Sequence, residues 1–176
     1  MERKLIILSR FFEDAQRTFN IRELARLIKV NHTTVRQYLS KLVKEGFLIK
    51  KKGNIYNSYA SDISQKYLNL KLFYNLEKLR KSHLIEFLEK QFDFPTIILF
   101  GSYAKARDTK DSDIDIYIIS NIKKQINIKS YELELNKEVN LHIFTKKEFE
   151  IQKQKNPELI NSLANGMILS GELEIL

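Results

Sequence analysis

Apolar residues in the first third of the chain recur at helical spacing in three successive segments. The predicted helices cover residues 2–18, 21–28 and 32–45. Asn20 and Asn31 stand directly before the second and third helices and are residue types that cap helix N-termini, and Glu23 is placed to complete a capping box. Gly46 is placed to end the third helix. The pattern therefore predicts three short helices, with a tight turn at Lys29-Val30 between the second and third.

After Gly46 the pattern changes to alternation. Residues 47–52 and 55–60 are predicted as two strands, because Gly53-Asn54 between them is a two-residue hairpin signal. Residues 61–94 then carry two broad apolar stripes that no glycine or proline interrupts. This segment is therefore predicted to be mostly helical, and to join the flanking parts of the chain by helix.

The next stretch combines an apolar strand with a cluster of small and acidic residues. Thr96–Phe100 is wholly apolar after its first residue, as is typical of a strand buried on both faces. It ends at Gly101-Ser102, where glycine allows close backbone approach and the amides and hydroxyl of a helix start suit a phosphate. A second strand is predicted over residues 113–119. Asp113 and Asp115 project from one face of it, about 6–7 Å apart, so both carboxylates can bind one divalent cation.

The remaining chain alternates predicted helices with short strands. Residues 138–144 alternate as a strand that places Glu138, Asn140 and His142 on one face. A helix is expected within residues 123–137, a second over 146–152 after the cap Thr145, and a third from Pro157 to near Asn165, followed by short strand pieces in 167–176.

Composition limits the class of protein. The chain has 176 residues, of which 43% are hydrophobic and 30% charged, as is ordinary for a soluble globular protein of one or two domains. It has no cysteine, which excludes disulfides and thiolate metal sites and fits a reducing cytoplasm. Neither a signal peptide nor an apolar run long enough to cross a membrane is present, so we expect a cytoplasmic protein.

The net charge of +8 is unevenly distributed along the chain. Residues 1–60 hold 13 Lys and Arg against 5 Asp and Glu, whereas residues 61–176 hold 17 of each. All of the excess positive charge therefore lies in the first third, which favours a polyanionic partner for that part.

The strand-glycine-strand stretch resembles the signature of the minimal nucleotidyltransferases of the DNA polymerase β type. That pattern is an apolar strand, Gly-Ser, about ten residues, then Asp-apolar-Asp. It is matched here by Leu99-Phe100-Gly101-Ser102 and by Ser112-Asp113-Ile114-Asp115. The resemblance implies an α/β domain with a mixed sheet that transfers a nucleoside monophosphate from an NTP, expected to be ATP, to an acceptor hydroxyl with Mg²⁺ or Mn²⁺.

The same resemblance implies roles for individual residues. Asp113 and Asp115 would be catalytic and would hold the metal, Gly101 and Ser102 would bind the nucleotide, and Lys105 and Arg107 are further phosphate-binding candidates. The family usually places a third carboxylate, which activates the acceptor hydroxyl, on a later strand; the matching position here is Asn140. An amide oxygen can still ligate the metal weakly but cannot accept a proton. Glu138 and His142 share its face as possible substitutes, and Ala106 stands where the family often has glycine.

Residues 1–60 resemble the winged helix-turn-helix DNA-binding domain. The resemblance rests on residues 21–25, 30–35 and 39–46, and implies that the third helix is a recognition helix for the major groove of duplex DNA. Its outer face offers contacts to bases and phosphates through His32, Thr33, Arg36, Gln37 and Ser40, and the hairpin offers Lys50, Lys51 and Lys52 to phosphates. Such domains often bind as dimers, so a homodimer is one expected form; a protein-docking module is the alternative.

We therefore expect an α+β protein of two domains, with a winged helix over residues 1–60, connecting helices over 61–94 and a nucleotidyltransferase domain over 95–176. Nucleotidyl transfer is the leading hypothesis. One alternative is a DNA-binding regulator whose second domain only senses nucleotide or docks a partner. Another is an antitoxin-like nucleotidyltransferase that modifies a small helical toxin.

Overall fold

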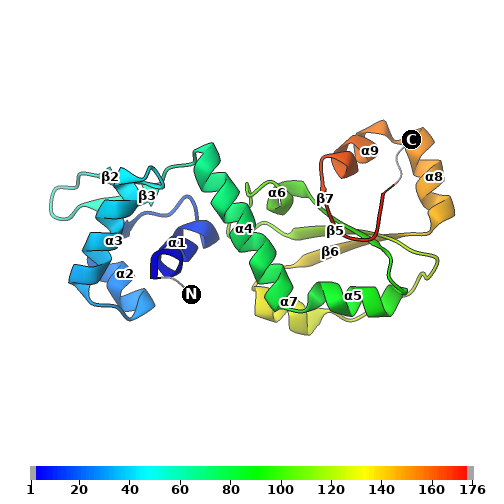
Figure 1. Cartoon of the computed structure of the whole chain (residues 1–176), viewed down its shortest axis with the longest axis horizontal. Helices are drawn as coiled ribbons and strands as arrows, with labels where there is room; N and C mark the ends of the chain where they lie inside the picture. Colours follow the sequence, from blue (N-terminus) through cyan, green and yellow to red (C-terminus); the bar gives the residue numbers. More distant parts are fainter. Residues whose placement is uncertain (1–2, 174–176) are drawn as a thin grey trace. The chain divides into compact units, whose positions relative to one another are not determined.

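The computed structural model describes residues 3–173, and the chain divides into two compact units, Met1–Tyr74 and Asn75–Leu176 (Figure 1). The division falls inside helix α4 (Gln65–Lys81), which runs without a break. Residues 61–94, expected as a separate connection, are therefore divided between the two units. The first part of α4 contributes core side chains to the N-terminal unit, and its last turns contribute to the core of the other.

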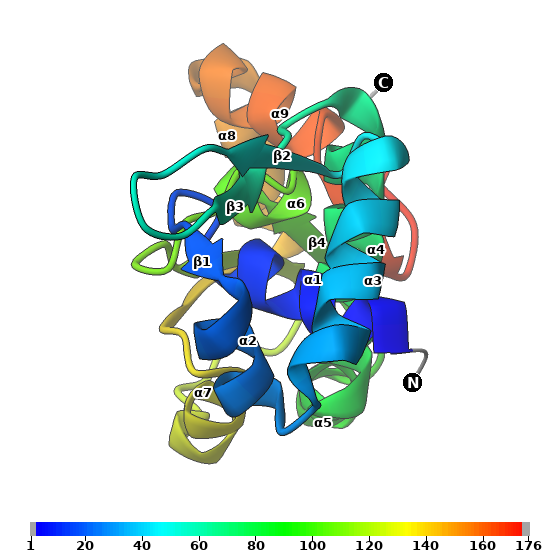
Figure 2. The same ribbon diagram turned by 90° about the vertical axis from the view of Figure 1, so that its left-hand side faces the viewer.

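Within the described residues, the N-terminal unit consists of three helices, the first part of α4 and a small antiparallel sheet (Figure 2). Its elements are α1 (Arg3–Glu13), β1 (Phe19–Asn20), α2 (Ile21–Ile28), α3 (His32–Lys44), β2 (Leu48–Lys51) and β3 (Ser58–Ser61), and the sheet has the order β1-β3-β2. The predicted helices are confirmed, although α1 ends at Glu13. The predicted residue 2 of that helix lies outside the described residues. The polar segment after Glu13 turns instead, with Arg17 N donating to Asp14 O at 3.2 Å.

Both predicted asparagine caps are present. Asn20 Oδ1 accepts from Glu23 N at 2.9 Å and Asn31 Oδ1 accepts from Thr34 N at 2.8 Å. The predicted capping box at Glu23 is not formed, because its carboxylate accepts from the Arg17 guanidinium at 2.5 Å. Between the two helices Lys29 adopts the left-handed conformation (φ 53°), which makes the tight turn.

The predicted two-residue hairpin at Gly53-Asn54 is wrong. Lys51 pairs with Ser58, so the connection is a longer loop over residues 52–57, in which Ile55 is 82% exposed. The register is determined by Tyr59, which is buried and pairs with Lys50 on one side and with Phe19 of β1 on the other. Because β1 is only two residues long, no periodicity in the sequence indicated it.

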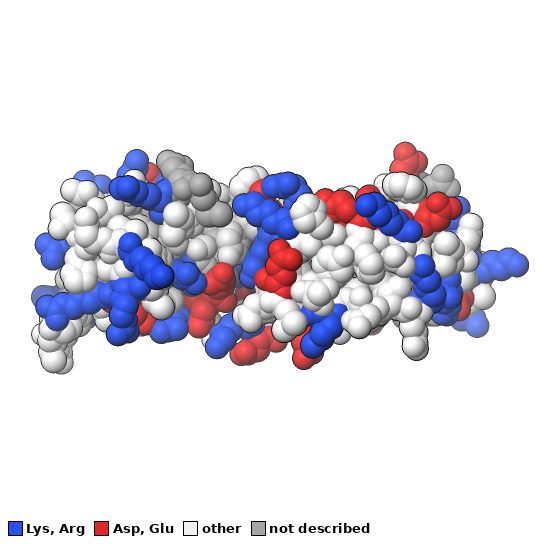
Figure 3. All heavy atoms as spheres, turned by 90° about the horizontal axis from the view of Figure 1, so that it is seen from below, with Lys and Arg blue, Asp and Glu red and all other residues white. Residues whose placement is uncertain are grey.

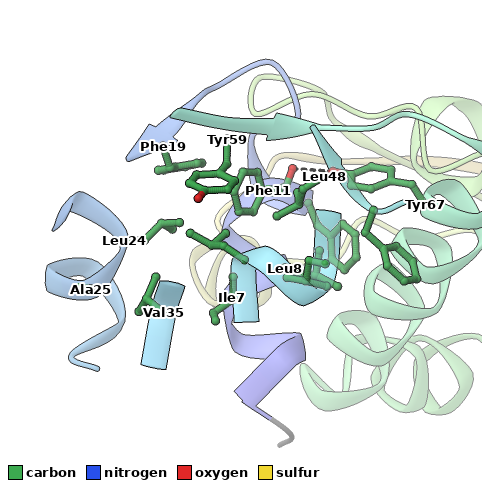
Figure 4. Close-up of a cluster of buried hydrophobic side chains, with 14 residues drawn as sticks. Ile7, Leu8, Phe11, Phe19, Leu24, Ala25, Val35, Leu48, Tyr59 and Tyr67 are labelled. Atoms are coloured by element: carbon green, nitrogen blue, oxygen red, sulfur yellow. Dashed lines mark hydrogen bonds between the residues drawn. The ribbon is translucent and has the colours of Figure 1, made fainter. Parts of the chain in front are cut away.

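The core of this unit is apolar and contains several aromatic side chains (Figure 4). Phe11 and Phe19 meet edge to face, with ring centroids 5.0 Å apart. Tyr67 from α4 is fully buried; its hydroxyl donates to Phe11 O at 2.8 Å and lies 3.1 Å from Ser61 Oγ. The buried side chains come from α1, α2, α3, α4 and all three strands, so they fix the outer face of α3 toward solvent.

The second unit is built on a mixed four-stranded sheet of order β6-β5-β4-β7. Its elements after α4 are α5 (Leu84–Phe92), β4 (Thr96–Phe100), α6 (Gly101–Ala104), β5 (Ile114–Ile119), α7 (Lys129–Leu135), β6 (Val139–Phe144), α8 (Lys146–Lys155), α9 (Pro157–Ala164) and β7 (Met167–Ser170). Strands β5 and β6 are parallel, whereas β4 is antiparallel to both β5 and β7. The predicted α+β class with a mixed sheet is confirmed. Part of the last predicted strand segment, residues 174–176, lies outside the described residues.

The two faces of this sheet have different coverings (Figure 1). On one face Leu99, Ile116 and their neighbours pack against α5, α7 and the end of α4. On the other face Phe149 of α8 and Leu163 of α9 cover Ile98, Tyr117 and Ile119. Beyond these helices the second face becomes polar, where β4 ends and β5 and β6 begin. Across residues 3–173, no helix is long and apolar enough to cross a membrane.

Candidate functional site

Asp113 and Asp115 lie at the start of β5, on the sheet face that α8 and α9 leave partly open. Asp115 is the second residue of β5, and Asp113 is the residue directly before the strand begins. Both side chains are partly buried. The predicted turn before them is present: Ser112 N donates to Thr109 O at 3.3 Å and Thr109 N donates to Ser112 Oγ at 2.9 Å. The two carboxylates are therefore presented by a closed turn followed by a buried strand.

Asn140 lies beside this pair, on the neighbouring parallel strand. It is in register with Asp115. Its Nδ2 donates to Asp113 Oδ2 at 3.1 Å and to Asp115 Oδ1 at 3.3 Å. One amide thus bridges both carboxylates, which places the three side chains in one cluster as the alternation of β6 predicted.

At Gly101 the backbone approaches the cluster of Asp113, Asp115 and Asn140 closely. Phe100 pairs with Asp115 across the sheet, and Gly101 follows it with φ 73°, in the left-handed region that favours glycine. A Cβ atom added at Gly101 would collide with Asp115 Oδ2. Since any side chain there would fill the space beside the carboxylate, the glycine keeps the start of α6 and Ser102 next to the acidic pair.

The turn that follows α6 places the two predicted basic residues near Ser102 along the backbone. Ser102 O accepts from Lys105 N at 3.2 Å and from Arg107 N at 2.9 Å, and both basic side chains are exposed. Between them Ala106 is buried with φ 52°. That left-handed conformation explains why glycine suits this position, since it costs other residues about 1–2 kcal/mol.

Three other side chains near the acidic pair are candidate proton acceptors: Glu138, His142 and Tyr117. Glu138 and His142 are exposed on the face of β6 that carries Asn140, and His142 packs beside Phe100 with ring centroids 5.5 Å apart. Tyr117 lies on the same face but is buried. Burial raises the pKa of its hydroxyl above the ordinary value, and the Glu148 carboxylate adds to the shift. Tyr117 therefore stays protonated at neutral pH and cannot serve as a base.

The acidic pair fits a divalent cation by the chemistry of its donors. Two carboxylate oxygens that already converge on one amide nitrogen are placed to converge on one cation. Mg²⁺ is commonly bound by one or two carboxylates, with phosphate oxygens and water completing its shell. Within residues 3–173 no group of three or more His, Cys, Asp or Glu side chains is placed to hold a metal. The two carboxylates of the acidic pair suit a cation that arrives with a phosphate ligand.

The residues predicted to contact DNA lie on the N-terminal unit. The outer face of α3 presents His32, Thr33, Arg36, Gln37 and Ser40, all exposed, while Val35, Leu39 and Leu42 of the same helix are buried. Lys50 and Lys51 on β2 and Lys52 in the following loop are exposed as well. Figure 3 shows Lys and Arg side chains spread over one surface of this unit, which it draws at the left.

A hollow in the same unit brings Arg22, Arg26 and Tyr56, which the sequence did not single out, together with residues already described. It is lined by Asn20, Arg22, Glu23, Arg26, His32 and Tyr56. The Arg22 guanidinium stacks on the Tyr56 ring, 4.9 Å from its centroid, and donates to its hydroxyl at 3.2 Å. Arg22 and Arg26 are one helical turn apart, a signal that the sequence carried. The contact of Tyr56 with Arg22 was not predicted, because residues 55–60 were predicted to be a strand.

Comparison with protein families identifies the second unit. The family model described as "Polymerase beta, Nucleotidyltransferase" matches residues 82–172, slightly more than half of the chain. No curated protein matches the chain. The match contains the acidic pair, Asn140 and Gly101-Ser102, and it does not extend to the helices and small sheet of the first unit. The chain belongs to the polymerase β-type nucleotidyltransferase family.

Proposed function

We propose that the protein transfers a nucleoside monophosphate from a metal-bound NTP, with ATP as the expected nucleotide and Mg²⁺ or Mn²⁺ as the metal, to an acceptor hydroxyl. The observation that carries the proposal is the convergence of Asp113 and Asp115 on one point beside Gly101. Acidic oxygens and a close backbone approach at one place suit a nucleotide phosphate bridged by a cation.

The proposed roles of the other residues follow from their positions. Ser102 and the amides at the start of α6 would hold the triphosphate, and Lys105 and Arg107 would neutralise its outer oxygens. A bound divalent cation would supply charge neutralisation of the reacting phosphate. The side chains of Asp113, Asp115 and Asn140 would hold that cation in place.

A sensor is the second candidate, and Asn140 favours it. An amide cannot accept the proton of the attacking hydroxyl, and the exposed Glu138 and His142 make no hydrogen bond to the acidic pair among those between described residues. In this version the domain binds the NTP and reports it to the DNA-binding unit without turning it over.

Incubation with labelled ATP and Mg²⁺ distinguishes the two. Transfer of label to a candidate acceptor, lost in Asp113→Ala/Asp115→Ala, supports the transferase. Binding of ATP without transfer, across all acceptors tried, supports the sensor. Absence of both binding and transfer contradicts either version.

We also propose that the N-terminal unit binds duplex DNA through the outer face of α3 and the loop after β2. Exposed arginine, glutamine and hydroxyl side chains on one helix face suit base edges and phosphates, and three successive lysines suit phosphates. The hollow beside His32 adds two further basic side chains, Arg22 and Arg26, to this proposed surface.

Replacing Lys50, Lys51 and Lys52 by alanine in the full chain is expected to weaken binding to all duplexes alike. Each lost phosphate contact removes about 0.9 from the slope of log affinity against log salt, so the slope should fall by up to about 3. Arg36→Ala should instead relax sequence preference by about 1–3 kcal/mol. Titration of labelled duplexes over a salt series measures both.

The matched control replaces three exposed lysines of the second unit, Lys129, Lys147 and Lys155, which keeps the net charge change equal. If the control lowers the slope as much as the first triple variant does, binding follows net charge alone. In that case the proposed DNA-binding surface is wrong.

A further inference from the structure

Lys137 is a lysine with a largely buried side chain, at the junction between α7 and β6. Its side chain is 8% exposed. Its Nζ donates to Thr109 O at 2.7 Å and to Ser112 O at 2.8 Å, with a longer bond to Lys110 O at 3.3 Å. Three carbonyl oxygens of one turn thus accept hydrogen bonds from a single ammonium group. Lys137 therefore stabilises the conformation of that turn.

The buried charge of Lys137 is balanced by a second buried group. The Asp108 carboxylate is 3% exposed and its Oδ2 lies 4.0 Å from Lys137 Nζ. Its other oxygen accepts from Asn75 Nδ2 at 2.9 Å, and the same nitrogen donates to Tyr103 O at 3.2 Å in α6. One polar network therefore connects the turn, α6 and the segment that precedes β6.

This network contacts the chain segments that lead into Asp113 and Asn140. Ser112, whose carbonyl Lys137 binds, is followed immediately by Asp113, and Asn140 lies three residues after Lys137 on β6. A further bond joins the same two segments, since Ile114 N donates to Glu138 O at 2.9 Å. Lys137 thus fastens the segment that carries Asp113 to the strand that carries Asn140.

We propose that Lys137 is a positioning residue for the cation: it holds Asp113 beside Asp115 and Asn140, so that the acidic pair binds a metal with little rearrangement. This role rests on the proposed function, in which the pair binds a cation together with the nucleotide. Groups that orient metal ligands contribute strongly to binding, and their loss typically weakens metal affinity by about 10–100-fold.

The test measures ATP affinity by calorimetry with Mg²⁺ and with EDTA for the wild type and Lys137→Met. We expect the gain in affinity that Mg²⁺ gives to the wild type to fall about 10–100-fold in Lys137→Met, and the affinity in EDTA to stay nearly unchanged. Lys137→Arg, which keeps the charge and the donors, should retain most of the gain. Lys129→Met, an exposed lysine on α7, is the matched control and should behave as the wild type.

A second variant separates positioning from stability, because Lys137→Met removes one of the contacts of the buried Asp108 carboxylate. Lys137→Met/Asp108→Asn removes both charges and keeps an oxygen for Asn75. The melting temperatures of both variants report stability, and the double variant should still lack the gain from Mg²⁺. Recovery of the full gain in the double variant, or equal losses with Mg²⁺ and EDTA, would overturn the proposal. If the wild type itself gains nothing from Mg²⁺, the proposed function fails, and the role of Lys137 with it.

Discussion

Asn140→Asp is expected to raise the rate of nucleotidyl transfer by about 10²–10⁴-fold, the range that general-base assistance provides. The new carboxylate would stand where the amide now lies, 3.1 Å from Asp113 Oδ2 and 3.3 Å from Asp115 Oδ1. There it would be able to take the proton of the acceptor hydroxyl, which an amide cannot do. The measurement is the initial rate of label transfer from ATP in Mg²⁺ for the wild type and the variant.

The same substitution has a second, independent effect. Without metal, three carboxylates at hydrogen-bonding distance repel one another, so Asn140→Asp should melt at a lower temperature than the wild type in EDTA. Mg²⁺ should restore its stability more than it does for the wild type. This readout does not depend on knowing the acceptor.

Three further variants show whether another residue already serves as the base. Asn140→Ala should not raise the rate, since it supplies no carboxylate. Glu138→Gln or His142→Ala should abolish whatever activity the wild type has if one of them accepts the proton. Rapid turnover by the wild type that survives Glu138→Gln, His142→Ala and Asn140→Asp alike would show that the proton acceptor lies elsewhere.

Gly101→Ala is expected to lower transfer by about 10²-fold, the loss that a displacement of about 1 Å at a reacting centre can cause. A methyl group there collides with Asp115 Oδ2, so either the carboxylate or the start of α6 must shift. The variant should also lose affinity for Mg²⁺-ATP, because both the metal ligand and the phosphate-binding backbone are affected. Rate and calorimetric affinity test the two consequences.

Gly46 provides a matched control for the backbone strain. It has nearly the same conformation, with φ 72°, but a Cβ atom there meets nothing within 4 Å. Gly46→Ala therefore reports the cost of the left-handed conformation alone, about 1–2 kcal/mol of stability. If Gly101→Ala destabilises the fold by the same amount and leaves Mg²⁺-ATP affinity intact, the close approach of Gly101 to Asp115 has no functional role.

The acidic site was largely predictable from the sequence because its parts depend on local pattern. The two-residue period of β5 places Asp113 and Asp115 on one face, and the same period in β6 places Asn140 on the face that meets them. The parallel pairing of β5 with β6 then brings these faces together, in register at Asp115 and Asn140. Because the apolar residues of both strands must face the core, that register could hardly be shifted by one residue.

The features that the sequence missed depend on contacts between distant segments. Strand β1 is too short to carry a period, and it exists because Phe19 pairs with Tyr59. Tyr56 contacts Arg22, which lies 34 residues earlier in the chain. Lys137 reads in the sequence as one more surface lysine among many, and only the fold shows that it lies under a turn 25 to 28 residues earlier in the chain.

The metal-binding role of Asp113 and Asp115 is tested most directly by calorimetric titration of ATP into the wild type and into Asp113→Asn/Asp115→Asn, each with Mg²⁺ and with EDTA. Asparagine keeps the shape of both side chains and removes their charge, so the fold should be preserved. We expect Mg²⁺ to raise the affinity of the wild type at least about tenfold, or about 1.4 kcal/mol, and to give the double variant no gain. Equal affinity of the wild type with Mg²⁺ and with EDTA, or an undiminished gain in the double variant, would contradict the assignment of Asp113 and Asp115 as the metal-binding pair of a nucleotidyltransferase site.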